Sequence, residues 1–354
     1  PPRSTLFPYT TLFRSYMDAR LYLAAYLAYY WPVSYIQMEH CLKEIAKSRK
    51  ETPQANIIEN KNISILDFGS GPGPMTLAIL DFFSRQAVLP DSIACTLTDT
   101  SIVALEKARS IIEACKYPFS VTIHTKHVSA FAESSFSDTF FDYIVFGHSL
   151  NEISEQSADL ASKIKELLKQ SLVNTGLALF IEPSLLETSR KLISLRNKLT
   201  ESEDFFCVSP CPNSRACSVL EAGESHTCHD SLISEIPELP AKLAKMLGLN
   251  RETIKMTWFA FSKQPLRTDP ALYRVVSDPM LNKAGRIRYI VCGSAGRISL
   301  SAHKTDSHAS QIGFFSLKRG DSFAIKGAEP RENGMGITNE TEISLIKDGG
   351  IQDC

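Results

Sequence analysis

The sequence predicts an α/β fold, in which a doubly wound, Rossmann-like sheet carries an N-terminal helical cap, a Cys-rich loop and a small C-terminal β domain. Three observations favour it. An apolar strand pattern runs into a glycine-rich turn and an apolar helix between residues 63 and 83. Further strand and helix patterns alternate up to about residue 183, which is typical of a parallel sheet. Three cysteines and two histidines then fall within residues 210–229.

The composition limits which classes of protein the chain can belong to. The chain has 354 residues, of which 44% are hydrophobic, enough for one large core and a second, smaller one. No apolar run reaches the roughly 20 residues that a membrane-spanning helix needs, so no membrane association is expected. Nine cysteines form an odd set without a signal peptide ahead of them, which favours a reducing compartment over a disulfide scaffold.

The first 15 residues stand apart from the rest of the chain. The stretch TLFPYTTLFRS (residues 5–15) resembles the translation of a sequencing adapter, so we expect residues 1–15 to be a non-native leader. If so, the native start and any targeting peptide are missing. The alternative is a genuine disordered leader.

Residues 16–60 predict the helical cap. Apolar and aromatic residues recur at helical spacing from Tyr16, and Pro32 is expected to end or restart the helix. A polar stretch, RKETPQANIIENKN, follows and separates the cap from the next strand. The tyrosines in this helix are expected to serve packing rather than binding.

The main domain, residues 61–200, begins at NISILDFGSGPGPM. A strand ends at Asp67, and Gly69, Gly71 and Gly73 follow before an apolar helix. Glycines allow a tight turn and let a ligand approach the helix N-terminus closely. The D-x-G-x-G-x-G spacing differs from the G-x-G-x-x-G pattern of dinucleotide binders.

The remaining strands of this domain place further polar residues at their carboxyl ends. Strand patterns lie near residues 93–101, 119–129, 141–153 and 175–184, with helices near 102–115 and 157–172. Ligands of doubly wound sheets bind at these strand ends. Five candidates fall there: Asp99, His148, Asn151, Glu152 and Glu182. For the last four, helix capping or a loop hydrogen bond is an equally good explanation.

The cysteine spacings suggest a metal site in residues 201–285. Five residues separate Cys211 from Cys217, ten separate Cys217 from Cys228, and 63 separate Cys228 from Cys292. Zinc knuckles pair cysteines two to four residues apart, whereas a [4Fe-4S] cluster needs four thiolates spread about a larger body. Spacing alone does not choose the metal, so zinc remains the alternative, and buried free thiols are a third explanation.

The glycine motif resembles motif I of class I S-adenosylmethionine (SAM) methyltransferases. That resemblance implies that Asp67 faces the methionine part of the cofactor, that Gly69, Gly71 and Gly73 make room for it, and that Asp99 binds the ribose. After the fourth strand many amino-directed nucleic-acid methyltransferases carry Asn/Asp-Pro-Pro-aromatic, but this chain reads HSLN. The departure weakens any assignment of catalysis, for which Asn151 and Glu152 are the candidates.

The order of the motifs DFGSGPG, HSLNEI, IEPS, PCPNSRACSV, TCH and GRIRYIVCGSAGRI resembles the Rsm-type methyltransferase-like family of ribosomal small-subunit proteins. The likeness spans residues 16 to about 326. It implies a [4Fe-4S] cluster on Cys211, Cys217, Cys228 and Cys292, with Cys207 as the reserve ligand. Asn213 stands where the family often has His, and the gap before Cys228 is longer, so the shape of the loop is less certain than its ligands.

The C-terminal part concentrates positive charge in a chain whose formal net charge is −1. Residues 251–326 contain 13 Lys or Arg and five acids, a local balance of 13 − 5 = +8. Such a segment favours contact with phosphates, although a solvated surface without a partner has the same composition. Residues 286–326 predict a small basic β domain, and residues 327–354 a disordered tail.

Two functions therefore remain open. The first is SAM-dependent methylation of small-subunit rRNA, and the second is a catalytically weak or inactive assembly factor that binds rRNA through the basic segment. Both predict the small ribosomal subunit and its rRNA as partners, and a monomer. The compartment would be the cytoplasm of a bacterium or archaeon, or the mitochondrial matrix if the chain is eukaryotic.

Overall fold

The computed structural model describes residues 16–50, 61–128, 136, 139–154, 159–232, 236–249, 253–265, 271–294, 296–332, 334–347 and 350–353. The expected leader, residues 1–15, lies outside them. The helices are α1 Arg20–Lys50, α2 Pro74–Ser84, α3 Ile102–Ala114, α4 Leu150–Ser154, α5 Leu160–Ser171, α6 Leu186–Thr200, α7 Glu238–Met246 and α8 Ser307–Gln311, with short 3-10 turns at η2 Tyr16–Asp18 and η3 Phe314–Ser316.

The first sheet contains eight strands: β1 Asn62–Phe68, β2 Ser92–Asp99, β3 Ser120–His127, β4 Phe141–Gly147, β5 Leu172–Pro183, β6 Phe206–Ser209, β7 Asp230–Leu232 and β8 Ile254–Ser262. Their order is β3-β2-β1-β4-β5-β8-β6, and β7 pairs with β8. The five strands β3, β2, β1, β4 and β5 are parallel to one another, whereas β8 runs antiparallel to β5. The order in which strands are added to the sheet changes direction between β1 and β4, so the carboxyl ends of these two parallel strands flank the crevice where such sheets bind ligands.

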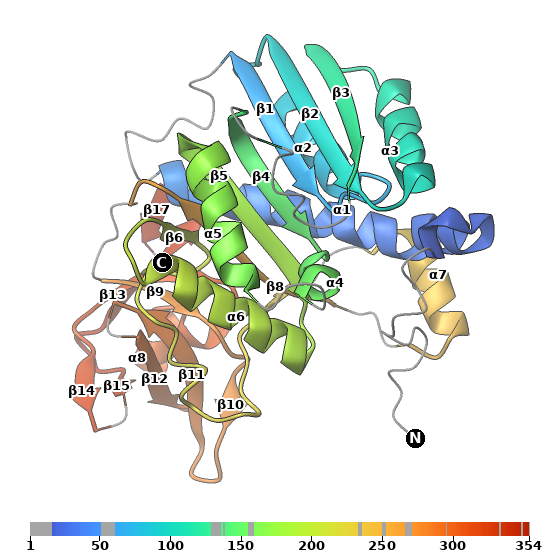
Figure 1. Cartoon of the computed structure of the whole chain (residues 1–354). Coiled ribbons are helices and arrows are strands. Elements are labelled where there is room, and N and C mark those ends of the chain that lie inside the picture. Colours follow the sequence, from blue (N-terminus) through green and yellow to red (C-terminus); the bar gives the residue numbers. More distant parts are fainter. Residues whose placement is uncertain are drawn as a thin grey trace.

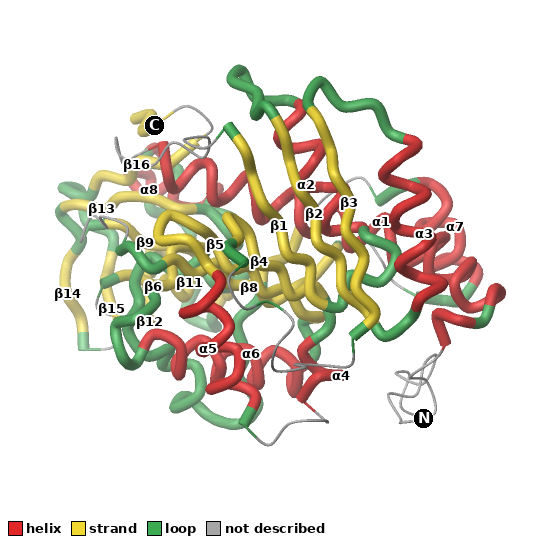
Figure 2. The backbone as a smooth tube through the Cα atoms, turned by 45° about the horizontal axis from the view of Figure 1, so that its top comes forward, coloured by secondary structure: helices red, strands yellow, loops and turns green. Residues whose placement is uncertain are grey.

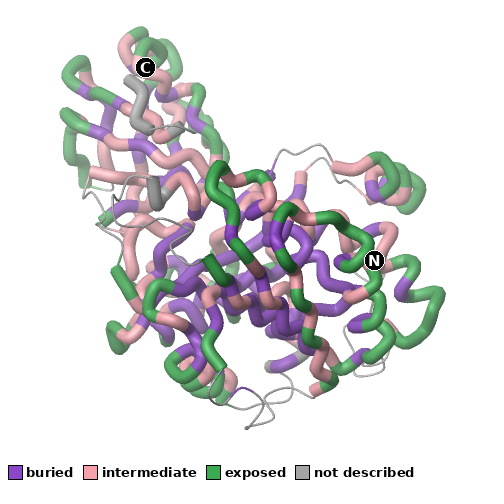
Figure 3. The backbone as a smooth tube through the Cα atoms, turned by 90° about the horizontal axis from the view of Figure 1, so that it is seen from above, coloured by how far each residue is buried: buried purple, intermediate pink, exposed green. Residues whose placement is uncertain are grey.

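Helices cover both faces of this sheet (Figures 1 and 2). On one face, apolar residues of α1, α2 and α3 form a core with inward residues of the strands, such as Ile65 and Val145. On the other face, α5 and α6 pack against residues that include Leu66 and Phe180. Neighbouring strand positions thus belong to opposite cores, and the sheet is buried on both sides, as parallel sheets are (Figure 3). The predicted doubly wound α/β sheet is confirmed in the structure.

Helix α1 continues through Pro32, so the expected break at this residue is wrong. A proline inside a helix removes one backbone hydrogen bond. Tertiary packing compensates: Val33 and Leu42 are buried in the core beneath α1, and Trp31 Nε1 donates to Pro72 O over 3.0 Å. Packing of one face overrides the local preference, as it often does in helices.

The second sheet is larger than the predicted β domain. It contains β9 Leu272–Val275, β10 Met280–Leu281, β11 Arg286–Gly293, β12 Gly296–His303, β13 Ser322–Lys326, β14 Glu329–Arg331, β15 Gly334–Gly336, β16 Glu342–Lys347 and β17 Gly350–Asp353. Its order is β14-β15-β12-β11-β9-β13-β16-β17, with β10 paired to β11. The expected boundary at residue 286 therefore misses β9 and β10.

The prediction of a disordered tail at residues 327–354 is also wrong. Strand β16 pairs antiparallel with β13, and Ile343 is buried while Leu345 packs against the same core. The polar and Gly-rich composition masked this short apolar alternation, which suits a strand that is buried on one side only. Within the described part of the chain, no helix is long and apolar enough to cross a membrane.

Candidate functional site

The glycine loop between β1 and α2 is a tight turn that glycine makes possible. The φ angles of Gly69, Gly71 and Gly73 are 72°, 51° and 74°, in the left-handed region that side chains disfavour. The backbone N–H groups of Gly69 and Ser70 both donate to Thr98 O on β2 over 2.9 Å. A Cβ on Gly69 would lie 2.6 Å from Ser149 Cβ, so this position also needs glycine for space.

Asp67, at the end of β1, is a buried acid with one unused acceptor. Only 1% of its surface is exposed. Thr76 Oγ1 on α2 donates to Asp67 Oδ2 over 2.7 Å, while Oδ1 is buried without a hydrogen-bond partner. Burial raises the pKa of Asp67 to about 7, against the opposing effect of the Thr76 hydrogen bonds, and the nearby charge of Asp99 adds to the increase.

Asp99, at the end of β2, lies beside the same loop. Its Oδ2 accepts from the Gly71 N–H and its Oδ1 from the Ser101 N–H, each over 2.8 Å. Burial raises the pKa of Asp99, although the backbone hydrogen bonds oppose the shift. Each carboxylate oxygen has a second lone pair, so hydroxyl groups could still donate to Asp99. The structure thus brings the two predicted acids together at the glycine loop.

The ends of β4 and β5 hold the predicted catalytic candidates in another arrangement. Glu182 is buried, and its Oε1 accepts from the Leu150 N–H over 2.9 Å while its Oε2 accepts from Asn151 Nδ2 over 3.4 Å. The carboxylate therefore caps the first turn of α4 and holds Asn151. Glu152 lies within α4, but its side chain is outside the part of the chain that the structure describes.

His148 has a left-handed backbone, with φ of 59°, at the turn that follows β4. Its Nε2 lies 2.8 Å from Gln37 Oε1 of α1, and its Nδ1 is buried without a partner. Burial lowers the pKa of His148 to about 4, so the ring is neutral near pH 7. The side chain of Ser149 lies against the glycine loop and its Oγ is likewise unpartnered.

The N-terminal segment covers the glycine loop, which sequence reasoning missed. The Trp31 hydrogen bond to Pro72 ties α1 to the loop, and Met17 Cε lies 3.9 Å from the position of a Cβ on Gly71. Asp18 accepts from Ser101 Oγ over 2.6 Å, close to Asp99. Apolar periodicity showed that α1 packs against the core but gave no sign of these polar contacts.

A second site lies where the first sheet meets the C-terminal sheet. A pocket there is lined by the four predicted cysteines together with Pro210, Pro212, His229, Asp230, Thr257, Trp258, Phe259, Arg274, Val276 and Arg297. Cys211, Cys217 and Cys228 come from the segments between β6 and β7, and Cys292 comes from β11. Cys207, the reserve ligand, is buried in β6 and does not line the pocket.

Hydrogen bonds shape the Cys-rich segment around this pocket. Asn213 Nδ2 donates to Gly293 O over 2.7 Å, which fastens the segment to the end of β11. Arg190 NH1 donates to Gly223 O and His226 O over 2.9 and 2.8 Å. Burial raises the pKa of the Cys228 and Cys292 thiols, and the charges of the neighbouring cysteines add to both shifts. No three His, Cys, Asp or Glu side chains among the described residues are arranged to hold a metal ion.

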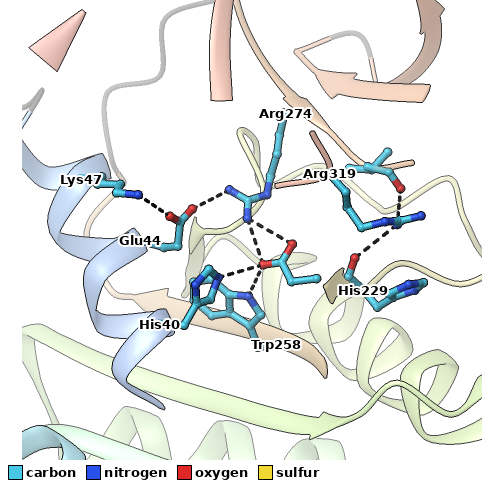
Figure 4. A network of polar contacts seen from close by, with 9 residues as sticks. His40, Glu44, Lys47, His229, Trp258, Arg274 and Arg319 are labelled. Atoms are coloured by element: carbon cyan, nitrogen blue, oxygen red, sulfur yellow. Dashed lines mark hydrogen bonds and ion pairs between the residues drawn. The ribbon is translucent and has the colours of Figure 1, made fainter. Parts of the chain in front are cut away.

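A buried polar network forms the wall of the pocket toward α1 (Figure 4). Asp230 accepts from Trp258 Nε1 over 2.6 Å and from Arg274 NH2 over 2.9 Å, and His40 Nε2 lies 3.6 Å away. Arg274 NH1 also pairs with Glu44 of α1 over 2.9 Å. Burial alone would raise the pKa of Asp230, but Arg274 and the hydrogen bonds hold it below its ordinary value. The network joins the N-terminal helix, the first sheet and the C-terminal sheet.

Comparisons with solved structures list methyltransferases with low similarity. The plantazolicin methyltransferase BpumL in complex with SAH has a TM-score of 0.39 and 13% identity, over 71% of this chain and 93% of that chain. A SAM-dependent methyltransferase from Thiobacillus denitrificans, in complex with S-adenosyl-L-homocysteine, has a TM-score of 0.32 and 17% identity, over 62% and 97% of the two chains. One from Methanosarcina mazei has a TM-score of 0.32 and 16% identity, over 57% and 92%. Similarity at this level carries no argument about activity.

A comparison with family models gives a more specific result. No protein with a curated description matches the chain significantly. The model of the family described as mitochondrial small ribosomal subunit Rsm22 matches residues 20–312. This match covers α1, the glycine loop, all four pocket cysteines, strands β9 to β12 of the C-terminal sheet and α8, which is far more than half of the chain. The chain belongs to the Rsm22 family of mitochondrial small ribosomal subunit proteins.

Proposed function

We propose that this chain is a SAM-binding, iron–sulfur-containing, methyltransferase-like protein that acts on the maturing small ribosomal subunit. Family membership supports the partner, and the glycine loop supports the cofactor. The observation that carries the proposal is the buried, unpartnered Oδ1 of Asp67 beside three left-handed glycines at the crevice of the sheet. In a eukaryote the site of action would be the mitochondrial matrix, and in a bacterium or archaeon the cytoplasm.

The residues at the glycine loop fit SAM. The unused acceptor of Asp67 suits a donor such as the ammonium group of the methionine moiety, because a buried acceptor without a partner is costly. The spare lone pairs of Asp99 suit ribose hydroxyls, although its carboxylate already accepts two backbone N–H groups. SAM would supply an electrophilic methyl group. The chain would orient it and exclude water, with α1 and η2 as the cover.

The chemistry of the described residues that line the cysteine pocket suits a [4Fe-4S] cluster, although their side chains are not arranged around a metal ion in this structure. Three thiols from one segment and a fourth from a distant strand line one pocket, and thiolates are the usual ligands of iron–sulfur clusters. Cys211, Cys217, Cys228 and Cys292 would hold the cluster. Its role would be structural, because the cluster would join the segment between β6 and β7 to β11 of the C-terminal sheet. Zinc, which four thiolates can also bind, is the alternative occupant.

Calorimetric titration with SAM and SAH tests the cofactor site. The wild-type chain is expected to bind both, and Asp99→Ala is expected to lose binding because Gly71 and Ser101 lose their shared acceptor. Asp91→Ala is the matched control, because Asp91 is an exposed acid at the opposite end of β2. Absence of heat with the wild-type chain, measured at several temperatures, would contradict the cofactor assignment.

A second candidate function is an assembly factor without methyl transfer. Two observations favour it: the chain lacks the Asn/Asp-Pro-Pro-aromatic motif after β4, and Asn151 is held by the buried Glu182. Both functions place the protein on the small subunit. Incubation of under-methylated small subunits with radiolabelled SAM separates them, because only the first function transfers label to rRNA.

The basic C-terminal segment is the proposed rRNA contact, but not all of its cations are free to contact phosphates in the structure. Arg274 is buried in the network with Asp230, and Arg319 pairs with Asp278. The exposed cations of the described part of this segment are Lys255, Lys283, Arg288, Lys304, Lys318 and Lys326. Replacing one phosphate-contacting cation should weaken RNA binding and lower the slope of log affinity against log salt by about 1. An unchanged slope across all six variants would exclude this surface.

A further inference from the structure

Arg196 of α6 is a buried cation without an acidic partner. Only 1% of its surface is exposed, and it forms no ion pair among the described residues. Its guanidinium donates to the carbonyl oxygens of Asn213, over 2.8 Å, and Arg215, both between Cys211 and Cys217. Its Nε is buried without any hydrogen-bond partner. The thiols of Cys207, Cys211 and Cys217 lie close enough that, as thiolates, they would act on this charge.

Arg297 shares part of this pattern, although it is only half-buried. It lies on β12, directly across the ladder from Cys292 on β11, and it lines the pocket. Its Nε is also buried and unpartnered, and no acid in the described part of the chain pairs with it. Its charge acts on Cys217 and Cys292. An arginine of helix α6 and an arginine of the C-terminal sheet thus lie close to the pocket thiols, and each has one unused Nε–H donor.

Arg274 shows that this pattern is not a general property of arginines near the pocket. It lines the same pocket, but Asp230 and Glu44 bind its guanidinium on two sides. Its charge is therefore balanced within the protein. A buried charge without such a partner is costly, so the buried Arg196 and the half-buried Arg297, whose Nε is buried, would both be satisfied by negative charge in the pocket.

We propose that Arg196 and Arg297 are the counter-ions of an anionic thiolate-ligated cluster, donate Nε–H hydrogen bonds to its sulfur atoms, and raise its reduction potential. This inference rests on the proposed [4Fe-4S] cluster. Four thiolates give the cluster a net negative charge, and reduction by one electron increases it. Positive charge and N–H donors near the sulfurs stabilise the reduced state more than the oxidised state.

The test is a redox titration of the full chain, purified without oxygen, with dithionite as the electron donor and electron paramagnetic resonance as the readout. Arg297→Gln removes charge and donor from a half-buried position on a strand. Arg297→Lys keeps the charge but removes the Nε–H group. Arg288→Gln is the matched control, because Arg288 is exposed on the neighbouring strand and does not line the pocket.

Arg297→Gln is expected to retain iron and sulfide but to show a lower reduction potential, so that at a fixed solution potential the ratio of reduced to oxidised cluster falls at least tenfold. Arg297→Lys should fall in between, and Arg288→Gln should match the wild-type chain. Arg196→Lys should lower the ratio as well, in whatever fraction of the protein retains iron. If the iron-loaded Arg297 variants have the same reduction potential as the wild-type chain, the proposed role of the arginines is overturned, whereas the cluster assignment stands. A wild-type chain that carries zinc or no iron would overturn the cluster, and this inference with it.

Discussion

The glycine loop and the cysteine pocket differ in the kind of charged side chain that each leaves without a full set of hydrogen bonds: an acid at the loop and arginines at the pocket. Among the charged side chains at the glycine loop, the unpartnered buried atom is an acceptor, Asp67 Oδ1, with the second acid Asp99 close by. Among the charged side chains at the cysteine pocket, the unpartnered buried atoms are donors, the Nε–H groups of Arg196 and Arg297. Buried polar groups are nearly always satisfied in native proteins. The first site therefore suits a ligand with a cationic donor, and the second suits an anion.

The two sites also differ in how they are built. The glycine loop needs seven consecutive residues and one neighbouring strand, so a local turn creates it. The pocket needs residues from β7, β8, β9, β11 and β12 and from the segment between β6 and β7, so it exists only when the two sheets are docked. Changes at the pocket should therefore disturb the relation of the sheets, whereas changes at the loop should stay local.

Cys292→Ser should have the largest effect. Cys292 is the only pocket cysteine that the C-terminal sheet supplies, so its loss removes one of the four proposed ligands and the link between the sheets. We expect iron content, measured in the anaerobically purified protein, to fall to nearly zero, with increased aggregation. Cys115→Ser is the matched control, because Cys115 is exposed at the end of α3. A brown Cys292→Ser protein with wild-type iron content would exclude this residue as a ligand.

Asp230→Asn should have the next largest effect, on stability. The change keeps the shape of the side chain but leaves the buried Arg274 with Glu44 as its remaining acidic partner. Breaking a buried ion pair typically costs about 3 kcal/mol or more, which urea unfolding followed by circular dichroism measures. Asp278→Asn is the control: its side chain is 76% exposed and pairs with Arg319 over 3.3 Å. We expect the control to change stability by no more than about 0.5 kcal/mol, and equal losses in both variants would exclude a special role of the network.

Gly69→Ala tests the locality of the glycine loop. The new Cβ would meet Ser149 Cβ at 2.6 Å, on a backbone with φ of 72°. We expect a loss of about 1–3 kcal/mol of stability from the backbone strain, a further loss from the clash, and at least tenfold weaker SAM binding in calorimetry. Gly248→Ala has the same backbone strain, with φ of 65°, but meets nothing within 4 Å. SAM affinity that falls equally in both variants would show that global destabilisation, rather than the loop, is responsible.

Sequence reasoning succeeded where the signal is local. The run from Asp67 to Gly73 and the alternating strand and helix patterns predicted the first sheet, because turns and apolar periodicity act over a few residues. The four cysteines were singled out from their clustering and from a family resemblance, and all four line one pocket. That they bind iron remains a prediction.

The sequence could not show which cations and acids complete each site. Arg196 lies in the segment LRNK of a helix whose polar residues read as solvent-facing, although it is almost fully buried. Asp230 and Arg274 are 44 residues apart, and nothing in the chain between them predicts their pairing. Short strands such as β16 escaped notice because a few apolar positions among Gly and polar residues are typical of loops as well.

The pH dependence of SAM binding should show the smallest effect. It tests directly whether the buried acid of the glycine loop contacts the cofactor. Burial raises the pKa of Asp67 to about 7, so at pH 6 the carboxyl is mostly protonated in the folded chain. The stability that this protonated group contributes to the ligand-free protein is fully present below the ordinary pKa of 3.8 and is lost as the pH rises through 7. The ammonium group of SAM should instead favour the ionised carboxylate. Affinity is therefore expected to rise by about tenfold between pH 6 and pH 7.5, with proton release near pH 6.5 detected by calorimetry in two buffers. Asp67→Asn should bind weakly with a flat profile, and a flat profile in the wild-type chain would show that Asp67 does not face the cofactor.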